Sequence, residues 1–481
     1  MPLDRRDFLA ASAAAGWAAM GAAPVWAAAE KNDLRIAVVG LRGRGKSHLA
    51  GLGKRVVALC DADRDVLDEQ HQKHLEERGV DAQKYVDFRE MLDKADIDGV
   101  AIATPNHTHC WIGVEAMQAG KHVYVEKPIS HNTWEGRQLV AAARKHDRIV
   151  QCGTQSRSSP SLQQAVKWLH SGELGSIQYA TGTCYKPRPP IGELDKPLSI
   201  SKAVDYDLWC GPAAKEDLYR PQLHYDWHWD WNTGNGDMGN QGIHQMDIAR
   251  WFLGEDRLAP RSRSVGGRLG YDDAGNTPNT QVVYHDYEAA PLLFETRGLP
   301  RSKEGQKQWG RSMDRYRGSG IGVIVQCEGG HLVIPSYSSV TAFDRSGKVV
   351  KEWSGGGDHF ANWVEAIQQN DRSILNGEVQ EGHLSSSLCH TGGVSHLVGE
   401  KATAEVIADE LAADPLFSDA FERMAGHLRA NQVDIDSSAQ LTLGPWLEVD
   451  PQTEQFVDNT AAQAHFKRDA RQGYAVADLG A

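Results

Sequence analysis

Residues 34–52, "LRIAVVGLRGRGKSHLAGL", join a run of apolar residues to a glycine turn and then to a helical pattern. A strand that is apolar at consecutive positions is typical of a parallel sheet covered on both faces. The turn places a helix N-terminus and bare main-chain N–H groups where a pyrophosphate can bind. Gly40 and Gly45 fit G-x-G-x-x-G, whereas Arg42 takes the middle glycine position and Gly43 follows it. The segment predicts the start of a dinucleotide-binding domain.

A second apolar strand, "RVVALCDAD", ends in Asp61, twenty-one residues after Gly40. An acidic residue at this spacing accepts hydrogen bonds from the adenosine ribose hydroxyls. A 2′-phosphate at the same place would meet a like charge, so Asp61 favours NAD over NADP. The alternative is that Asp61 is only a turn residue at the end of a strand.

Three more strand-and-loop units follow in "DGVAIATPNHTH", "KHVYVEKPIS" and "RIVQCGTQSR". Strands that alternate with helices of this length predict an α/β fold with a parallel, doubly wound sheet. Such sheets bind ligands beyond the carboxyl ends of their strands. The candidate cofactor-binding residues at that edge are Thr104, Asn106, His109, Glu126, Lys127 and Gln155.

The N-terminus has the pattern of an export signal. Arg5 and Arg6 precede an apolar, Ala-rich run that ends in an A-x-A site at residues 27–29. Paired arginines of this kind are typical of the twin-arginine type, whose machinery exports folded proteins. A membrane-spanning helix is disfavoured because glycines and a proline interrupt the short run. We expect residues 1–29 to be a signal peptide, and the protein to be periplasmic and folded, with its cofactor bound, before export.

Charge and cysteine content exclude several classes of function. The net charge of -13 argues against nucleic acid, which proteins bind largely through Lys and Arg. The seven cysteines are scattered, with no C-x-x-C pair, so they indicate neither a disulfide framework nor a zinc site. After the signal, no segment is predicted to span a membrane.

Residues 224–231, "HYDWHWDW", alternate aromatic with His and Asp side chains. On a strand, the three tryptophans would share one face and the His and Asp residues the other. Alternating His and Asp could hold a metal, but nothing else in the chain requires one. Tryptophan faces that stack on sugar C–H groups suit a carbohydrate site, while the alternative places at least one tryptophan in the core. The candidate substrate residues are Trp227 and His228 from this stretch, Tyr185 and Lys186 at the end of the earlier strand "SIQYATGTCYK", and Asp237 and Asp247 further along the chain.

Together, the glycine turn, "TPNHTH", "EKP" and "GIHQMD" resemble the Gfo/Idh/MocA family (glucose–fructose oxidoreductase, inositol dehydrogenase and MocA) over residues 34 to about 400. The resemblance implies an NAD(P)-binding Rossmann domain and a second α/β domain, whose open, mainly antiparallel sheet backs the substrate site and often mediates homo-oligomers. It also implies that Lys127 and His244 flank the reacting carbon of the substrate beside the nicotinamide.

From the resemblance we expect three regions after the signal. Residues 34–155 form the Rossmann domain, residues 156–400 the substrate and oligomerisation domain, and residues 401–481 an acidic, helix-rich extension packed on the domains. A helix expected to begin near Gly242 would carry His244. The helix pattern in "HLSSSLCHTGGVSHLVG" adds His383 and His390, either of which could reach the substrate site.

Asn240 departs from the family pattern. Family members usually have an acidic residue two positions before the glycine of G-I-H, and it forms a dyad with the histidine. Asparagine cannot raise the pKa of His244 in this way, so His244 should be a weaker base unless Asp237 or Asp247 supplies the carboxylate. Asn240 could instead be a helix N-cap, for which Asn is well suited.

Three classes of function remain open. The first is an NAD-dependent oxidoreductase that acts on a sugar or cyclitol hydroxyl, with Lys127, His244 and Asn240 in the catalytic site. The second is a redox-neutral, NAD-dependent glycoside hydrolase or lyase. The third is a non-catalytic sugar-binding protein, against which the retained Lys127 and His244 argue. Outside the cytoplasm no soluble NAD pool exists, so we expect the cofactor to remain bound between turnovers.

Overall fold

The computed structural model describes residues 34–480, so the expected signal peptide lies outside the described residues. Within that range, no helix is both long and apolar enough to cross a membrane. The first part of the chain forms a six-stranded parallel sheet in the order β3-β2-β1-β4-β5-β6. Its strands are β1 (Ile36–Val39), β2 (Val56–Cys60), β3 (Gln83–Tyr85), β4 (Gly99–Ile102), β5 (His122–Val125) and β6 (Val150–Cys152).

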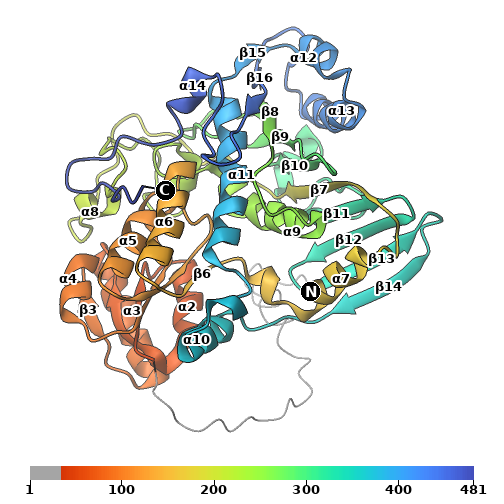
Figure 1. Ribbon diagram of the computed structural model, residues 1–481. Coiled ribbons are helices and arrows are strands. Elements are labelled where there is room, and N and C mark those ends of the chain that lie inside the picture. The colour runs from red at the N-terminus through yellow and green to blue at the C-terminus, as the bar shows by residue number, and fades with distance from the viewer. Residues whose placement is uncertain (1–33, 481) are drawn as a thin grey trace, which may run out of the picture. The chain divides into compact units, whose positions relative to one another are not determined.

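Helices cover both faces of this sheet, as the apolar strands require (Figure 1). They are α2 (Arg44–Leu52), α3 (Arg64–Arg78), α4 (Phe88–Lys94), α5 (Asn106–Gln118) and α6 (Thr133–Lys145). Local signals set their ends: Asp63 caps the start of α3 by accepting the N–H of Asp65, and left-handed Gly79 ends the helix. This sheet is the predicted Rossmann-type sheet.

The second sheet has eleven strands and is mainly antiparallel, with only β7 and β10 parallel to each other. Along its path the order is β14-β13-β12-β11-β7-β10-β9-β8-β16-β15, and β17 also pairs with β8. The strands are β7 (Ile177–Tyr185), β8 (Arg261–Gly267), β9 (Thr280–His285), β10 (Leu292–Arg297), β11 (Ile321–Cys327), β12 (Gly330–Ser336), β13 (Ser339–Asp344), β14 (Val349–Ser354), β15 (Glu400–Ala402), β16 (Leu441–Leu443) and β17 (Leu447–Glu448).

Three helices pack on one face of this sheet: α7 (Pro160–His170), α9 (Ile243–Leu253) and α11 (Val379–Leu397). Helix α11 also contacts α6 and β6, so it lies between the two sheets (Figure 1). Helix α10 (His359–Gln369) belongs to a region that we expected in the second domain. Instead, its Trp363 packs in the core of the six-stranded sheet, so the chain returns to the first domain before α11.

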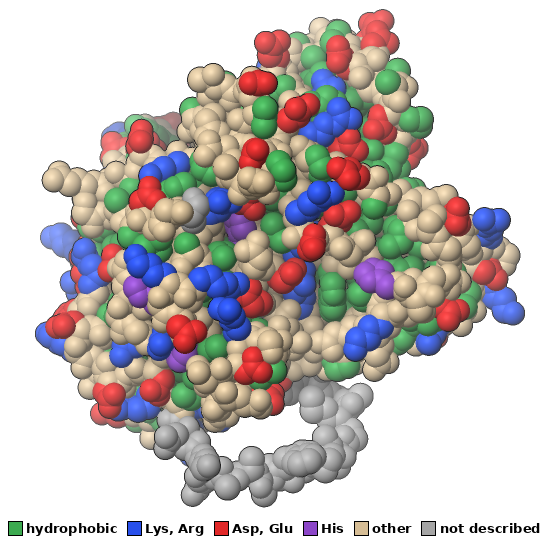
Figure 2. All heavy atoms as spheres, viewed as in Figure 1, with side chains coloured by type: hydrophobic (Ala, Val, Ile, Leu, Met, Phe, Trp, Pro, Cys, Tyr) green, Lys and Arg blue, Asp and Glu red, His purple; other side chains and the backbone are tan. Residues whose placement is uncertain are grey.

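The C-terminal extension does more than cover the surface. Its strands β16 and β17 pair with β8, and α12 (Ala404–Leu411) and α13 (Pro415–Ala430) pack on the face of the large sheet opposite α9. Acidic side chains gather on the outer side of these two helices (Figure 2). After α14 (Thr460–Gln463) the chain runs back to the first domain, where Leu479 N donates a hydrogen bond to Gln138 Oε1 at 2.7 Å.

Candidate active site

A cavity of about 670 Å³ opens at the carboxyl ends of β1, β2, β4 and β5. Its other wall comes from the second domain, including the segments around residues 208, 224 and 240 and the turn between β12 and β13. One continuous space therefore runs from the glycine turn to Lys127 and His244. The predicted cofactor residues that line it are Gly40, Arg42, Gly43, Asp61, Thr104, Asn106, His109, Glu126, Lys127 and Gln155.

The glycine turn gives the cavity a bare main-chain wall. Gly40 has φ +85°, and a Cβ there would lie 2.7 Å from the carbonyl carbon of Ala103. Gly43, at the N-cap of α2, also has positive φ and lines the cavity. Gly45 does not line it; a Cβ there would collide with the carbonyl of Gly40, so this glycine lets α2 pack against β1. This turn leaves room for a pyrophosphate at the helix N-terminus.

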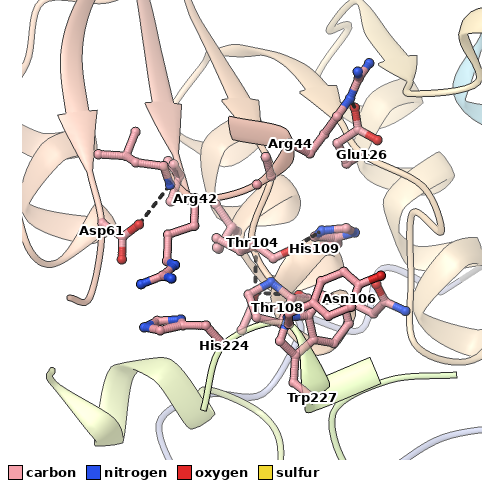
Figure 3. A pocket seen from close by; sticks show the side chains of 18 of the residues that line it. Arg42, Arg44, Asp61, Thr104, Asn106, Thr108, His109, Glu126, His224 and Trp227 are labelled. Atoms are coloured by element: carbon pink, nitrogen blue, oxygen red, sulfur yellow. Dashed lines mark hydrogen bonds and ion pairs between the residues drawn. The ribbon is translucent and has the colours of Figure 1, made fainter. Parts of the chain in front are cut away.

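Asp61 closes the same end of the cavity (Figure 3). Its Oδ2 accepts a hydrogen bond from Leu41 N at 2.8 Å and its Oδ1 accepts one from Asp63 N at 3.0 Å. Asp61 is therefore a turn residue as well as a cavity residue. The Arg42 side chain extends beside it toward His224, whose Nε2 lies 2.9 Å from Asp63 Oδ2. The carboxylate, the bare turn and the cavity together fit the ribose and pyrophosphate of a dinucleotide.

The loop after β4 is fixed by its polar side chains. The ring nitrogens of His109 lie 2.6 Å and 2.7 Å from the carbonyl oxygens of Pro128 and Thr104. Asn106 donates to Asn235 Oδ1 at 3.1 Å. His109 thus holds the ends of β4 and β5 together, and Asn106 ties this loop to the second domain.

Glu126 is the most heavily hydrogen-bonded carboxylate of the cavity. Its Oε1 accepts from Arg44 Nε at 2.7 Å and Gln155 Nε2 at 3.3 Å, and His48 Nε2 lies 3.1 Å away. Burial opposes ionisation of Glu126, but Arg44 and His48 outweigh it and hold the pKa well below its usual range. Glu126 therefore stays ionised and fixes the strand end that carries Lys127.

Lys127 donates from Nζ to the main-chain carbonyl of Asn240 at 2.5 Å. Asn240 belongs to a π-helical turn, Met238–Gly242, which precedes α9. The turn of the chain at this point directs a main-chain acceptor to the ammonium group. Burial lowers the pKa of Lys127 below 10.5, although the charge of Glu126 opposes this shift. The result is a lysine held in one place and more easily deprotonated than a surface lysine.

His244 lies at the start of α9, close to the predicted position. Within residues 34–480 no hydrogen bond is formed by its ring, and the ring of Tyr337 lies 4.9 Å away between centroids. Burial, and then the charge of Lys127, hold the pKa of His244 well below 6.5. His244 is therefore a neutral imidazole that faces the cavity.

Neither expected substitute carboxylate reaches His244. Asp237 accepts two hydrogen bonds from Arg188, one of them from Nε at 2.8 Å. Asp247 accepts from Arg157 Nε at 2.8 Å and from Ser385 at 2.7 Å. Both carboxylates are buried in ion pairs, so they organise the fold beneath the cavity instead of tuning the histidine.

The structure also corrects the helix-cap interpretation of Asn240. The residue lies inside the π-helical turn, and the N-cap of α9 is Gly242, which has no side chain to cap with. Asn240 lines the cavity, but no hydrogen bond joins its amide to His244 in the described part of the chain. The main-chain carbonyl of Asn240, not its side chain, accepts the hydrogen bond from Lys127.

Two of the six substrate candidates, Lys186 and Trp227, line the cavity. The other four do not: Asp237 and Asp247 are in the ion pairs above, Tyr185 donates to Glu295 at 2.7 Å, and His228 is bound to the carbonyl of Tyr225. The expected strand at residues 224–231 is instead a 3-10 turn, Asp226–Trp229, so its side chains do not alternate between two faces.

Several residues that line the cavity have no motif or spacing in the sequence that marks them as functional. Tyr337, in the turn between β12 and β13, is 40% exposed and its hydroxyl accepts a hydrogen bond from Gln241 at 2.8 Å. Trp209, at the end of the short helix α8 (Tyr206–Cys210), lines the cavity from the second domain. The expected helix-borne histidines serve elsewhere: His383 lies 2.6 Å from Glu454, and His390 lies outside this cavity.

Residues 186–235 cover the cofactor end of the cavity. Asp205 N donates to the carbonyl of Ala62 at 2.8 Å, and Arg64 N donates to the carbonyl of Ala203 at 3.0 Å. The C-terminal tail secures this cover, because Arg471 donates to Asp207 Oδ1 at 2.7 Å. The wall beside Asp61 is thus built by segments distant in sequence.

Two family models match successive parts of the chain. "Oxidoreductase family, NAD-binding Rossmann fold" matches residues 34–154, and "Oxidoreductase family, C-terminal alpha/beta domain" matches residues 176–294. Myo-inositol 2-dehydrogenase of Thermotoga maritima is 27% identical over 223 residues, which are 46% of this chain and 56% of the relative. Levoglucosan dehydrogenase of Pseudarthrobacter phenanthrenivorans is 27% identical over 169 residues, 35% of this chain and 36% of the relative.

Solved structures agree on the fold. Aldose-aldose oxidoreductase from Caulobacter crescentus has a TM-score of 0.55 at 17% identity, covering 75% of this chain and 97% of the other. The WlbA dehydrogenase from Bordetella pertussis, in complex with NADH and UDP-GlcNAcA, has a TM-score of 0.54 at 16% identity, covering 76% and 97%. The chain spans about half the length of the inositol dehydrogenases that it matches. Both domain models and the shared fold lead to one conclusion: the chain belongs to the Gfo/Idh/MocA oxidoreductase family.

Proposed function

We propose that this protein is an NAD-dependent oxidoreductase that acts on a hydroxyl group of a sugar or cyclitol and keeps its cofactor bound between turnovers. The observation that carries the proposal is the single cavity that joins the glycine turn and Asp61 to Lys127 and His244. The relatives named above as inositol and levoglucosan dehydrogenases support this substrate class.

Different residues of the cavity would carry out different steps of such a reaction. A nicotinamide held beside these residues would supply the hydride acceptor and donor for the substrate carbon. Neutral His244 can take the hydroxyl proton on an imidazole nitrogen as the carbonyl forms. The Lys127 ammonium, held by the Asn240 carbonyl, can donate a hydrogen bond to the substrate oxygen on which charge develops.

NAD is proposed over NADP because of the Asp61 carboxylate beside the ribose end of the cavity. Arg42 is the residue that could oppose this choice, because it also lines that end. Arg64, three residues after Asp61, turns its side chain toward the Ala203 carbonyl, 3.4 Å away, and does not line the cavity. Titration of both dinucleotides into apoprotein tests the proposal, and tighter binding of NADP would overturn it.

A redox-neutral hydrolase or lyase is the second candidate. In that route, oxidation of one ring carbon would acidify the neighbouring C–H, and loss of that proton and of the leaving group would form a double bond. In a hydrolase, water would then add across this bond, whereas a lyase would omit the addition, and in both the hydride would finally return to the oxidised carbon. The positive charges of Lys127 and Lys186 near neutral His244 favour the enolate that this route forms. Retained cofactor suits it too, because the cofactor is regenerated in place. The cover formed by residues 186–235 supports retention.

One experiment separates the candidates. Purified protein is denatured and the released dinucleotide is identified by mass spectrometry; intact protein is then assayed without added cofactor. Turnover of free sugars only when a second carbonyl compound is present supports the oxidoreductase. Multiple turnovers on glycosides alone would support the redox-neutral route. Strict dependence on added, exchanging NAD would refute cofactor retention. Lys127→Ala and His244→Ala variants should lose turnover in either case.

We also propose export through the twin-arginine machinery, for which the sequence of residues 1–29 is the support. Replacement of Arg5 and Arg6 by lysine should leave the protein in the cytoplasmic fraction. Periplasmic recovery of that variant would argue against this route. We further propose that the protein assembles as a homo-oligomer, which light scattering of the purified protein tests.

A further inference from the structure

The last part of the described chain, residues 464–480, is a tail that touches both domains. After α14 the tail passes α8 of the cover and ends beside α6 of the first domain (Figure 1). On the cover, Arg471 N donates to the carbonyl of Pro212 at 3.4 Å. On the first domain, Leu479 N is bound to Gln138 of α6. The tail therefore connects the cover of the cofactor cavity to the domain beneath it.

Helix α8 forms part of the cavity wall. Its residues Leu208 and Trp209 line the cofactor cavity, whereas Asp207 does not. Nε2 of His107, from α5, lies 2.8 Å from the carbonyl oxygen of Trp209, so α8 rests on the first domain. The Asp207 carboxylate is left for contacts outside the cavity. Any movement that uncovers this part of the cavity must displace α8.

Arg471 binds α8 at several points. It donates to Asp207 Oδ1 at 2.7 Å, to the Asp207 carbonyl at 2.6 Å and to the carbonyl of Gly211, just after the helix, at 2.9 Å. One guanidinium can do this because it carries five N–H donors in a fixed fork. The other oxygen of the Asp207 carboxylate accepts from the hydroxyl of Tyr474. Hydrogen bonds from Tyr474, Arg471 and Lys215 hold the pKa of Asp207 well below its usual range, so the carboxylate stays charged.

Tyr474 joins α8 to the opposite wall of the cavity. Its ring packs on Trp111 of α5, with 5.1 Å between the ring centroids, and the guanidinium of Arg89 lies 5.7 Å from the centre of the same ring. Trp111 lines the cofactor cavity from the first domain. Helices α5 and α8 therefore cannot separate here unless the Tyr474 hydroxyl leaves Asp207 or the ring leaves Trp111.

We propose that Arg471 and Tyr474 are positioning residues that hold α8 on the cofactor cavity and thereby slow release of the dinucleotide. This inference rests on the proposed function, in which the cofactor stays bound between turnovers. Neither residue lines the cavity, so both act through Asp207 and α8 instead of touching the cofactor. Loss of their hydrogen bonds makes opening of the cover more frequent, and the dissociation rate of the dinucleotide rises with it.

The test is the dissociation rate of NAD from the full chain. Protein loaded with radiolabelled NAD is diluted into excess unlabelled NAD, and the label that remains bound is followed with time. Arg471→Met removes the side-chain hydrogen bonds to α8, and Tyr474→Phe removes the hydroxyl but keeps the ring on Trp111. We expect each change to raise the dissociation rate at least about fivefold, and the double variant to raise it at least about tenfold.

Arg429→Met is the matched control. It removes another guanidinium–carboxylate pair, with Asp436, whose N–O distance is also 2.7 Å and which does not line the cofactor cavity. We expect the dissociation rate of this variant to stay within about twofold of the native rate. Urea unfolding of each apoprotein is measured alongside, because a purely structural role would lower stability without a selective effect on release.

The outcomes separate this inference from the proposed function. Slow release from the native protein and an unchanged rate in the double variant would overturn the role of the tail and leave cofactor retention standing. Rapid release from the native protein would refute retention, and the inference with it. An equal increase in Arg429→Met would show that general destabilisation is the cause. If Arg471→Met does not fold, Tyr474→Phe decides alone, and unchanged release in that variant overturns the inference.

Discussion

Replacing Asn240 with aspartate would place a carboxylate one helical turn before His244, in the position where the family usually has one. Residues four apart on a helix have Cβ atoms about 6 Å apart. At that distance a unit charge contributes about 3 kcal/mol for an effective dielectric constant of about 20, or about two pKa units. Asn240 lies at a cavity that water enters, so we expect the pKa of His244 to rise by one to two units.

The direction of the pH shift follows from the protonation state in which His244 can act as a base. A base must be unprotonated, so activity falls as the pH drops through the pKa of His244. In the native protein this pKa is held well below 6.5 by burial and by Lys127, and kcat/KM should be flat through mildly acidic pH. In Asn240→Asp the acidic limb should move up by one to two pH units. The pKa of Lys127 should rise with it, so the alkaline limb moves in the same direction.

Asn240→Ala is the matched control, because it removes the amide but keeps the main-chain carbonyl that binds Lys127. The assay is kcat/KM against pH on the substrate identified by the turnover screen. Identical profiles for native protein and Asn240→Asp would show that His244 is not the base. The same shift in Asn240→Ala would show that the added charge is not the cause.

Three further predictions concern the same cavity. Lys127→Ala should reduce kcat by at least about a hundredfold, while the dissociation constant of NAD stays within a few-fold of the native value. Turnover assays and dinucleotide titration measure the two quantities, and near-native turnover would contradict the role of Lys127. Asp61→Ala should narrow the preference for NAD over NADP, and an Arg42→Ala change in that background should weaken NADP again, both measured as dissociation constants. Asp247→Asn should lower the free energy of unfolding by about 3–5 kcal/mol, because it leaves Arg157 buried without its main partner. Urea unfolding measures this change. A variant that is as stable as the native protein but has a raised KM would show that Asp247 contacts the substrate after all.

Features set within one element could be predicted from the sequence. The glycine turn before α2 and the Glu126-Lys127 pair at the end of β5 follow from strand and turn patterns, because the carboxyl ends of parallel strands share one edge. The start of α9 at Ile243 follows from the period of its apolar residues. These positions depend on interactions within one segment of the chain, so the sequence alone is enough to predict them.

Features set by distant partners could not be predicted. Asp237 and Asp247 looked available for catalysis, but Arg188 and Arg157, from segments 49 and 90 residues away, bind them in the core. Tyr337 reaches His244 only because a hairpin of the second sheet ends beside α9. The alternating pattern at residues 224–231 suggested a strand, yet Asp226–Trp229 form a 3-10 turn, and the carbonyl of Trp229 accepts hydrogen bonds from the distant Asn276 and Thr277 main chain.

The charges around the reacting position bear on which proposed chemistry the protein performs. Glu126 is occupied by Arg44, and Asp237 and Asp247 by their own arginines, so no free carboxylate is available beside His244 among the described residues. Lys127 and Lys186 also line the cavity, and neither forms an ion pair within residues 34–480. An enzyme that only oxidises an alcohol gains from a carboxylate that stabilises the protonated histidine, whereas formation of an enolate gains from cations around a neutral base. This arrangement of charges is the observation that supports the second, redox-neutral candidate, and Lys186→Met tests it against the proposed oxidoreductase. If the redox-neutral route operates, that variant should slow proton exchange at the carbon next to the oxidised one, followed in deuterated water, more than it slows hydride transfer. Equal slowing of both steps would support the proposed oxidoreductase.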